Sequence, residues 1–298
     1  MAAADGVLIL TGPTCSGKST LAIELAERFD AEIVGADSRQ IYRGMPVGTA
    51  APSAAQLARV RHHLIAFLDP HERYNAARFT RDAMDAIAGA AVRGKRSIVV
   101  GGTGFYLRAL AGDVALSAAG DPAIRERLAR EARLHPPETL HAWLSVRDPG
   151  RAAQLAAGDR YRVVRALEIA LAGERGASAP EQRSLREAAI PFVKLALVVD
   201  SAELDERIGA RVDAMLRDGF LDEAERIGAS AIASDAVGYP QALAYLAGQS
   251  THGELRRMLV RVTRRYAKRQ RTWLRSEPGV RFLGARDAAA AASEALGW

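Results

Sequence analysis

The chain has 298 residues, 49% of them hydrophobic, so it can bury the core of one large domain together with an insertion. Its one cysteine excludes an internal disulfide and a cysteine-rich zinc site, and no apolar run approaches the ~18 residues of a membrane span. The formal net charge of +6 indicates a polyanionic partner, and the lack of a signal-peptide pattern predicts a cytoplasmic location.

The first chemical motif lies between an apolar run at 7–10, which predicts a strand, and a helical pattern at 20–29. It fits the phosphate-loop (P-loop) pattern G-x-x-x-x-G-K-[ST] and consists of Gly12, Pro13, Thr14, Cys15, Ser16, Gly17, Lys18 and Ser19. Glycines let backbone N–H groups surround an anion, and the following helix adds its positive dipole end. Lys18 adds a point charge, and the Ser19 hydroxyl can hold Mg²⁺. The motif predicts a site for a di- or triphosphate.

Two further strands are predicted before residue 112. The first spans 31–36 and ends at Asp37-Ser38-Arg39-Gln40. The second spans 97–100 and runs into Gly101-Gly102-Thr103-Gly104. Between and after them we expect a Gly- and Pro-rich loop at 42–52 and helices at 53–60, 75–93 and 105–111. This order predicts a parallel sheet flanked by helices, with Asp37 at the carboxyl end of a strand and in the same crevice as the P-loop.

The pattern changes at about residue 112. Helices are predicted at 121–133, 138–145 and 160–171, and a polar stretch at 173–189 predicts an exposed loop. Strand character returns at 194–199, a helix follows to residue 218, and a short strand is expected at 280–283. The predicted fold is therefore a P-loop NTPase-like α/β core, formed by 1–112 and 191–298, with an all-α insertion at 113–190.

A basic helix is predicted at 251–275. One face carries Leu255, Leu259, Val262, Tyr266 and Trp273. Much of the remainder is positive, with Arg256, Arg257, Arg261, Arg264, Arg265, Lys268, Arg269 and Arg271. Because almost no acidic residue lies within four positions after Glu254, we expect this charge to be uncompensated. The helix is either a solvated surface element or a contact for a phosphate backbone.

Two absences narrow the class of P-loop enzyme. The strand at 97–100 ends in Gly-Gly-Thr rather than the second acid that holds Mg²⁺ in nucleotide hydrolases, and there is no Asn-Lys-x-Asp stretch for guanine recognition. This favours a transferase over a switch ATPase. His62 and His63 are adjacent on an apolar run, so their side chains point to opposite faces of a strand and a shared metal is not expected.

Several motifs together resemble the tRNA dimethylallyltransferase (tRNA isopentenyltransferase) family in its compact bacterial form. Besides the P-loop, they are D-S-R-Q-I-Y-R-G-M at 37–45, V-G-T-A at 47–50, H-H-L-I at 62–65, V-V-G-G-T-G-F-Y-L at 99–107, R-V-V-R-A-L-E at 162–168, G-Y at 238–239 and K-R-Q-R-T-W-L-R at 268–275. They keep the family order from about residue 7 to 283. Many relatives have a lysine where this chain has Ala51, and Pro240 and Gln241 also depart from the family pattern.

The resemblance implies transfer of a dimethylallyl group from dimethylallyl diphosphate to N6 of the adenine 3′-adjacent to the anticodon. The tRNAs concerned read codons that begin with U. The P-loop would hold the diphosphate of the donor with Mg²⁺ on Ser19, and Arg211 would add a guanidinium. From the sequence alone, the preferred interpretation of Arg211 is a surface charge spaced i,i+4 on its helix. Lys18, Asp37 and Thr103 are the expected catalytic residues.

Two of these residues keep a second interpretation. Asp37 is either the general base that accepts the N6 proton or a Mg²⁺ ligand or helix N-cap. Thr103 is either the N-cap of the helix at 105–111 or a group beside the reacting centre.

The resemblance also implies contacts with the tRNA anticodon stem-loop, whose target adenine must be extruded into a pocket between the core and the insertion. The matching positions are Asp37, Ser38, Arg39, Gln40, Thr103, Arg125, Tyr161, Arg162, Val163, Val164 and Arg165. A monomer is expected. The alternatives are an isopentenyltransferase acting on free adenine nucleotides, a P-loop small-molecule kinase, and a non-catalytic ATP-dependent RNA-binding module.

Overall fold

The computed structural model describes residues 6–114, 116, 121–173 and 183–298. Its contacts divide the chain into a core unit, Met1–Val114 with Arg183–Trp298, and an insertion unit, Ala115–Gln182. None of the helices within the described ranges has the length and apolar character needed to cross a bilayer.

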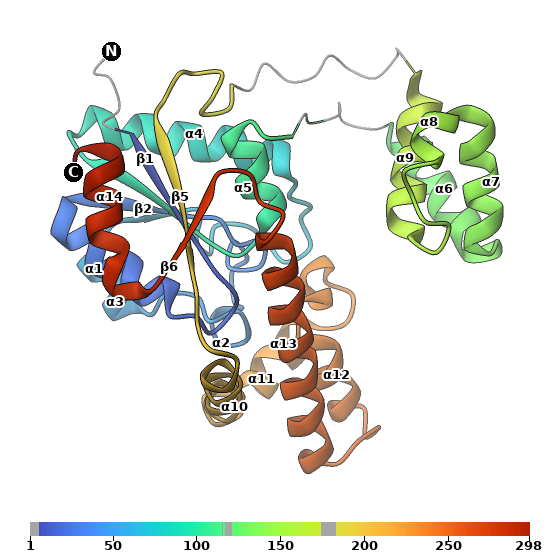
Figure 1. Cartoon of the computed structure of the whole chain (residues 1–298). Coiled ribbons are helices and arrows are strands. Elements are labelled where there is room, and N and C mark those ends of the chain that lie inside the picture. Colours follow the sequence, from blue (N-terminus) through green and yellow to red (C-terminus); the bar gives the residue numbers. More distant parts are fainter. Residues whose placement is uncertain (1–5, 115, 117–120, 174–182) are drawn as a thin grey trace. The chain divides into compact units, whose positions relative to one another are not determined.

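The core unit is built on one parallel sheet with the strand order β3-β2-β4-β1-β5-β6 (Figure 1). The strands are β1 (Val7–Thr11), β2 (Ala31–Gly35), β3 (His62–His63), β4 (Arg96–Val100), β5 (Phe192–Leu197) and β6 (Val280–Leu283). Every residue of β1 and β2 is buried, because helices cover both faces of the sheet. The predicted fold class, a P-loop-like α/β sheet with helices on both faces, is confirmed.

The strand register brings the functional loops to one edge. Val100 of β4 is paired with Leu10 of β1 on one side and with Gly35 of β2 on the other. The carboxyl ends of these strands are therefore level with one another. The P-loop, the Asp37 turn and the Gly101–Gly104 loop all leave the sheet at this edge, as the sequence predicts.

Helices pack on the two faces of the sheet. The core helices are α1 (Lys18–Phe29), α2 (Pro46–Thr49), α3 (Ala54–Arg59), α4 (Ala76–Val92), α5 (Gly104–Ala111), α10 (Ser201–Arg217), α11 (Phe220–Ile227), α12 (Tyr239–Leu246), α13 (His252–Leu274) and α14 (Ala288–Leu296). Apolar residues of α1 and α14 share one cluster with Leu8, Leu10 and Ile98 of the sheet, and α4 and α5 lie together against the other face (Figure 1). A second cluster joins α10, α11, α12 and α13.

Several helix starts follow from local sequence. Asn75 accepts the N–H of Arg78 at the start of α4, and Asp200 accepts the N–H groups of Ala202 and Glu203 at the start of α10. At α13, Thr251 and Glu254 form a reciprocal capping box. These side chains satisfy N–H groups that have no partner within their helix.

The insertion unit contains four helices within its described residues. They are α6 (Pro122–Leu134), α7 (Pro137–Arg147), α8 (Pro149–Ala152) and α9 (Arg160–Ala172). Leu128, Leu140, Leu144, Val163 and Leu167 form its apolar core. The predicted helices are confirmed, and α8 is an additional turn that the sequence analysis did not predict.

The structure corrects three local predictions. The predicted loop at 42–52 contains α2, because Glu223 accepts the N–H groups of Val47 and Gly48. Strand β5 begins and ends two residues earlier than expected. Of the predicted exposed loop at 173–189, residues 174–182 lie outside the described residues. Leu185, by contrast, is buried, and its N–H donates to the carbonyl of Leu110 at 2.8 Å, which ties this stretch to the core unit.

Candidate active site

The P-loop connects β1 to α1 and has the geometry of an anion cradle. Gly17, directly before α1, adopts a left-handed conformation with φ 86°, which favours glycine. The hydroxyl oxygen of Ser16 is buried and has no hydrogen-bond partner within the described part of the chain. A buried donor without a partner is costly, so a bound diphosphate oxygen would satisfy it.

Lys18 lies in the first turn of α1, with its ammonium nitrogen 3.3 Å from the carbonyl oxygen of Pro13. Burial lowers the pKa of Lys18, the Asp37 carboxylate acts in the opposite direction, and the Arg211 guanidinium lowers the pKa further. The three charged groups are therefore close enough to interact. A bound diphosphate would stabilise the ammonium form of Lys18.

Arg211 extends from α10 to the P-loop. Its guanidinium donates to the Thr14 hydroxyl at 3.3 Å and to the Gly48 carbonyl at 3.4 Å. The alternative of a surface charge paired within the helix is wrong for Arg211, but it describes Arg207, which pairs with Glu203 at 2.5 Å. Arg207 also donates to the Cys15 carbonyl at 3.4 Å, a P-loop contact that the sequence analysis missed. Arg207 lies four residues before Arg211 and on the same face of the helix, and this spacing was the sequence signal that could have indicated the contact.

The Asp37 turn is fixed through one carboxylate oxygen. Oδ1 accepts the N–H groups of Arg39 at 2.8 Å and Gln40 at 3.4 Å. No group among the described residues donates to Oδ2, so this oxygen can accept a proton. The hydroxyl of Thr103 accepts the N–H of Ser38 at 2.9 Å. Thr103 occupies the N-cap position of α5, but its side chain joins the Asp37 turn instead of capping the helix.

A small pocket lies between the P-loop and the Asp37 turn. Its polar lining includes Lys18, Ser19, Asp37 and Gln40. Its apolar lining includes Ile33, Ile65 and Val100. Oxygen ligands from Ser19, Asp37 and Gln40 suit Mg²⁺, which binds few protein groups and completes its shell with phosphate and water. No cluster of three His, Cys, Asp or Glu side chains within the described ranges could hold a metal by itself.

The Asp37 carboxylate affects the pKa of two tyrosines, Tyr106 and Tyr266. Burial and the negative charge of Asp37 both raise the pKa of Tyr266 on α13. Burial also raises the pKa of Tyr106 on α5, with a smaller effect of Asp37 in the same direction. Both phenols therefore stay neutral at physiological pH.

The residues expected to contact tRNA occupy both units. In the core, Arg39 pairs with Asp235 at 2.8 Å, and the Gln40 amide donates to the carbonyls of Thr49 and Ala50 at 3.1 and 2.9 Å.

In the insertion unit, Arg125 and Arg165 both pair with Glu168, each at 2.7 Å. Tyr161 is 83% exposed, whereas Val163 is buried in the core of the unit. Arg162 pairs with Asp159 at 3.3 Å, and Val164 packs against the apolar cluster.

The expectation of uncompensated charge on α13 is wrong for two arginines. Arg256 pairs with Asp213 at 2.6 Å and Arg264 pairs with Asp205 at 3.0 Å. Both acids lie on α10, so a search within four positions along α13 could not find them. Arg257, Arg261, Arg265 and Lys268 have no acidic partner among the described residues.

The side chain of His63 has an acidic partner, so its position does not require a metal ion. Its Nε2 lies 2.6 Å from a carboxylate oxygen of Glu32, which also binds Arg93 at 2.6 Å. The Nδ1 atom of His62 instead lies 2.8 Å from the Val60 carbonyl.

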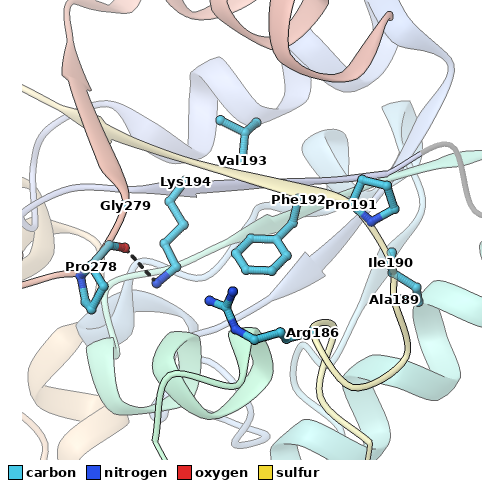
Figure 2. A pocket seen from close by; sticks show the side chains of 9 residues that line it. All are labelled: Arg186, Ala189, Ile190, Pro191, Phe192, Val193, Lys194, Pro278 and Gly279. Carbon is cyan, nitrogen blue, oxygen red and sulfur yellow. Dashed lines mark hydrogen bonds between the residues drawn. The ribbon is translucent and has the colours of Figure 1, made fainter.

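A separate cavity of about 520 Å³ is lined by Arg186, Phe192, Lys194 and Pro278 (Figure 2). It lies at the start of β5, where Phe192 is paired with Val7, and so at the opposite end of the strands from the P-loop. Lys194 forms ion pairs with Asp113 and Glu277, and Arg186 pairs with Asp113 at 2.7 Å. Because its cations are neutralised, this cavity is a weaker candidate for a diphosphate than the P-loop.

Comparison with known proteins identifies the family of the chain. A family model described as IPP transferase matches residues 40–277, and one described as isopentenyl transferase matches residues 5–72. The chain is 45% identical over 283 residues to "tRNA dimethylallyltransferase 1" of Citrifermentans bemidjiense, covering 93% of this chain and 91% of that protein. It is 45% identical over 279 residues to the tRNA dimethylallyltransferase of Thiobacillus denitrificans, covering 91% and 89%.

Solved structures agree with this result. The full-length tRNA isopentenylpyrophosphate transferase from Bacillus halodurans is similar with a TM-score of 0.71 and 32% identity, covering 98% of this chain and 97% of that one. A eukaryotic dimethylallyltransferase acting on tRNA is similar with a TM-score of 0.77 and 26% identity, covering 97% and 76%. The chain therefore belongs to the IPP transferase family of prenyl-transferring enzymes.

Proposed function

We propose that this protein transfers a dimethylallyl group from dimethylallyl diphosphate to N6 of the adenine 3′-adjacent to the anticodon. The tRNAs would be those that read codons beginning with U, and the second product is pyrophosphate. The observation that carries the proposal is the pocket shared by the P-loop residues Lys18 and Ser19 and by the carboxylate of Asp37. The curated relatives named tRNA dimethylallyltransferase support the same chemistry.

The donor side of the site stabilises a leaving anion. In the reaction the bond between C1 of the allyl group and the diphosphate oxygen breaks, and its electron pair leaves with pyrophosphate. Lys18, Arg211 and the P-loop N–H groups are placed to bind that charge. Mg²⁺, held by Ser19, would neutralise further charge on the diphosphate.

The acceptor side must remove a proton. The N6 lone pair of adenine is delocalised into the ring, so N6 must lose a proton as the new C–N bond forms. Asp37 accepts that proton at Oδ2, the oxygen to which no described residue donates, while Oδ1 keeps the turn in place. Thr103, joined to this turn through Ser38, orients the loop beside the base.

The tRNA contacts are part of the proposal. The target adenine leaves its stack to reach the pocket, and the bases beside it are recognised as a single strand. Exposed side chains of the insertion, such as Tyr161 and Arg162, are available for this contact, as are the cations of α13 that have no acidic partner among the described residues. We propose a cytoplasmic monomer, in keeping with its tRNA substrate.

One assay separates the proposed function from its alternatives. The protein is incubated with Mg²⁺ and labelled dimethylallyl diphosphate, together with unmodified tRNA or with AMP, and in parallel with labelled ATP. We expect label in tRNA alone, with release of pyrophosphate. Label in AMP would identify an enzyme acting on free nucleotides, and phosphate transfer from ATP would identify a kinase.

A further inference from the structure

Gln270 is a buried amide in the middle of the basic helix α13. Its side chain is 7% exposed, although the two residues beside it in the chain are arginines. The carbonyl Oε1 accepts the backbone N–H of Thr14 in the P-loop at 2.7 Å. The amide Nε2 donates to the backbone carbonyl of Gly102, after β4, at 3.1 Å. One side chain therefore joins the two loops that flank the pocket.

The glycines of the Gly101–Gly104 loop fit closely against α13. A Cβ atom on Gly102 would lie 2.3 Å from Nε2 of Gln270, and a Cβ on Gly104 would lie 2.2 Å from the Trp273 ring. Gln270 and Trp273 are three residues apart and share one face of the helix. The Gly-Gly-Thr-Gly and Arg-Gln-x-Thr-Trp motifs, far apart in the sequence, therefore form a single contact.

This contact continues to the candidate base. Gly102 precedes Thr103, whose hydroxyl accepts the N–H of Ser38, the residue after Asp37. On the other side, Thr14 receives the guanidinium of Arg211 at its hydroxyl. The Gln270 amide thus links the groups that bind the diphosphate to the loop that supports the base, in addition to the hydrogen bond from the Thr11 hydroxyl to the Gly101 carbonyl. The amide of Gln270 supplies both the acceptor and the donor that the two backbone groups require.

We propose that Gln270 is a positioning residue that sets the separation between the P-loop and the Thr103 loop, and with it the geometry between the leaving pyrophosphate and Asp37. The proposal rests on the proposed function. It assigns Gln270 a role distinct from the exposed cations of α13, because its side chain faces the two loops and not solvent.

Two substitutions test the link from opposite sides. Gln270→Met keeps the volume of the side chain and removes both hydrogen bonds. Gly102→Ala keeps Gln270 but places a methyl group where its amide nitrogen lies. The double variant combines Gly102→Ala with Gln270→Ala, which removes the group that the methyl would meet, and Gln270→Ala alone is made for comparison. Gln249→Met is the matched control, because Gln249 is exposed and makes no side-chain hydrogen bond within the described residues.

The measurements are the single-turnover transfer rate at saturating substrates, the affinity for inorganic pyrophosphate, the affinity for tRNA and the thermal midpoint. Both Gln270→Met and Gly102→Ala should lower the rate about 10- to 100-fold and weaken pyrophosphate binding, because small displacements of reacting groups are costly. Affinity for tRNA should stay within about twofold. The double variant should be no slower than the slower of its component single variants, since each removes the same link.

Unchanged rate and pyrophosphate affinity in Gln270→Met, or a loss confined to tRNA affinity, would overturn the proposal. If Gln270→Met does not fold, Gly102→Ala decides the question through the same readouts, since it retains Gln270. Failure of the wild-type protein to prenylate tRNA would reject the proposed function instead, and the pyrophosphate measurement would still report on the P-loop.

Discussion

One oxygen of the Asp37 carboxylate is occupied by the N–H groups of its own turn, and the other has no donor among the described residues. The first contact fixes the side chain, and in the proposed function the second oxygen supplies the basic lone pair. This arrangement separates the structural role of the residue from its chemical role, so the two can be tested separately.

The variant Asp37→Asn keeps an oxygen that can accept the N–H groups of Arg39 and Gln40 but removes the base. We expect turnover to fall about 10²- to 10⁴-fold, while tRNA still binds. Asp37→Ala should also lower turnover severely, because it removes the base and the contacts of the turn. Single-turnover kinetics and tRNA binding are measured on the same preparations. Lost tRNA binding combined with normal chemistry would show that Asp37 is not the base.

For single residues, the sequence predicted those candidate site residues that belong to a local pattern. Lys18 belongs to a motif with fixed spacing, and Asp37 follows a strand directly. Gln270 could not be assigned, because its partners Thr14 and Gly102 lie 256 and 168 residues away. Such contacts depend on the strand order and on helix packing, which a local pattern does not encode.

At the scale of elements, β5 carries a buried lysine that joins distant parts of the core. The ammonium of Lys194 is 3% exposed and pairs with Asp113 and Glu277. Asp113 lies just before the insertion and Glu277 just after α13. Glu277 also accepts the guanidinium of Arg108 at 2.7 Å. This cluster ties α5, β5 and the end of α13 together.

The variant Lys194→Met should lower the free energy of unfolding by about 3–5 kcal/mol, because two buried carboxylates lose a shared cation. Urea unfolding followed by circular dichroism measures the change. The control is Lys95→Met, whose pair with Asp30 is exposed, and it should change the stability by less than about 1 kcal/mol. Equal effects of the two substitutions would contradict this account of the cluster.

The buried carboxylate of Glu32, which pairs with the exposed Arg93, gives a pH dependence. Hydrogen bonds from Arg93 lower the pKa of Glu32 from its ordinary 4.5 to about 2, against the opposing effect of burial and with additional help from His63. Because the folded-state pKa is depressed, Glu32 contributes stability above pH 4.5 that is lost as the pH falls toward 2.

We therefore expect Glu32→Gln to be less stable than the wild type at neutral pH, with the difference shrinking as the pH approaches 2. Urea midpoints measured across this acidic range provide the test. If the difference in stability between Glu32→Gln and the wild type stayed constant over this pH range, the lowered pKa of Glu32 would be contradicted.

The hydrophobic pattern of α13 predicts some of its buried residues and misses others. Its capped start, its length and the buried Leu255 and Leu259 follow the predicted pattern. The later turns bury Ala267, Gln270 and Leu274 in place of the fully apolar face that was expected. A polar side chain can be buried when all its donors and acceptors are satisfied, and hydrophobic periodicity does not detect this case.

At the scale of the whole molecule, the sequence predicted the class of the fold because alternating strands and helices permit few arrangements. It did not predict the strand order β3-β2-β4-β1-β5-β6, which places β4 between β1 and β2. That order is what brings the Thr103 loop between the P-loop and the Asp37 turn. The active site therefore depends on a topological feature that only the structure reveals.

In the proposed reaction the P-loop holds the diphosphate of a prenyl donor with its allyl carbon facing Asp37. The most direct test is a crystal structure of the protein with Mg²⁺ and a thio analogue of dimethylallyl diphosphate that does not ionise. The account predicts diphosphate oxygens within about 2.6–3.2 Å of the Lys18 ammonium and of P-loop N–H groups, with C1 facing Oδ2 of Asp37. A P-loop without the diphosphate, or a hydrocarbon chain directed away from Asp37, would contradict it.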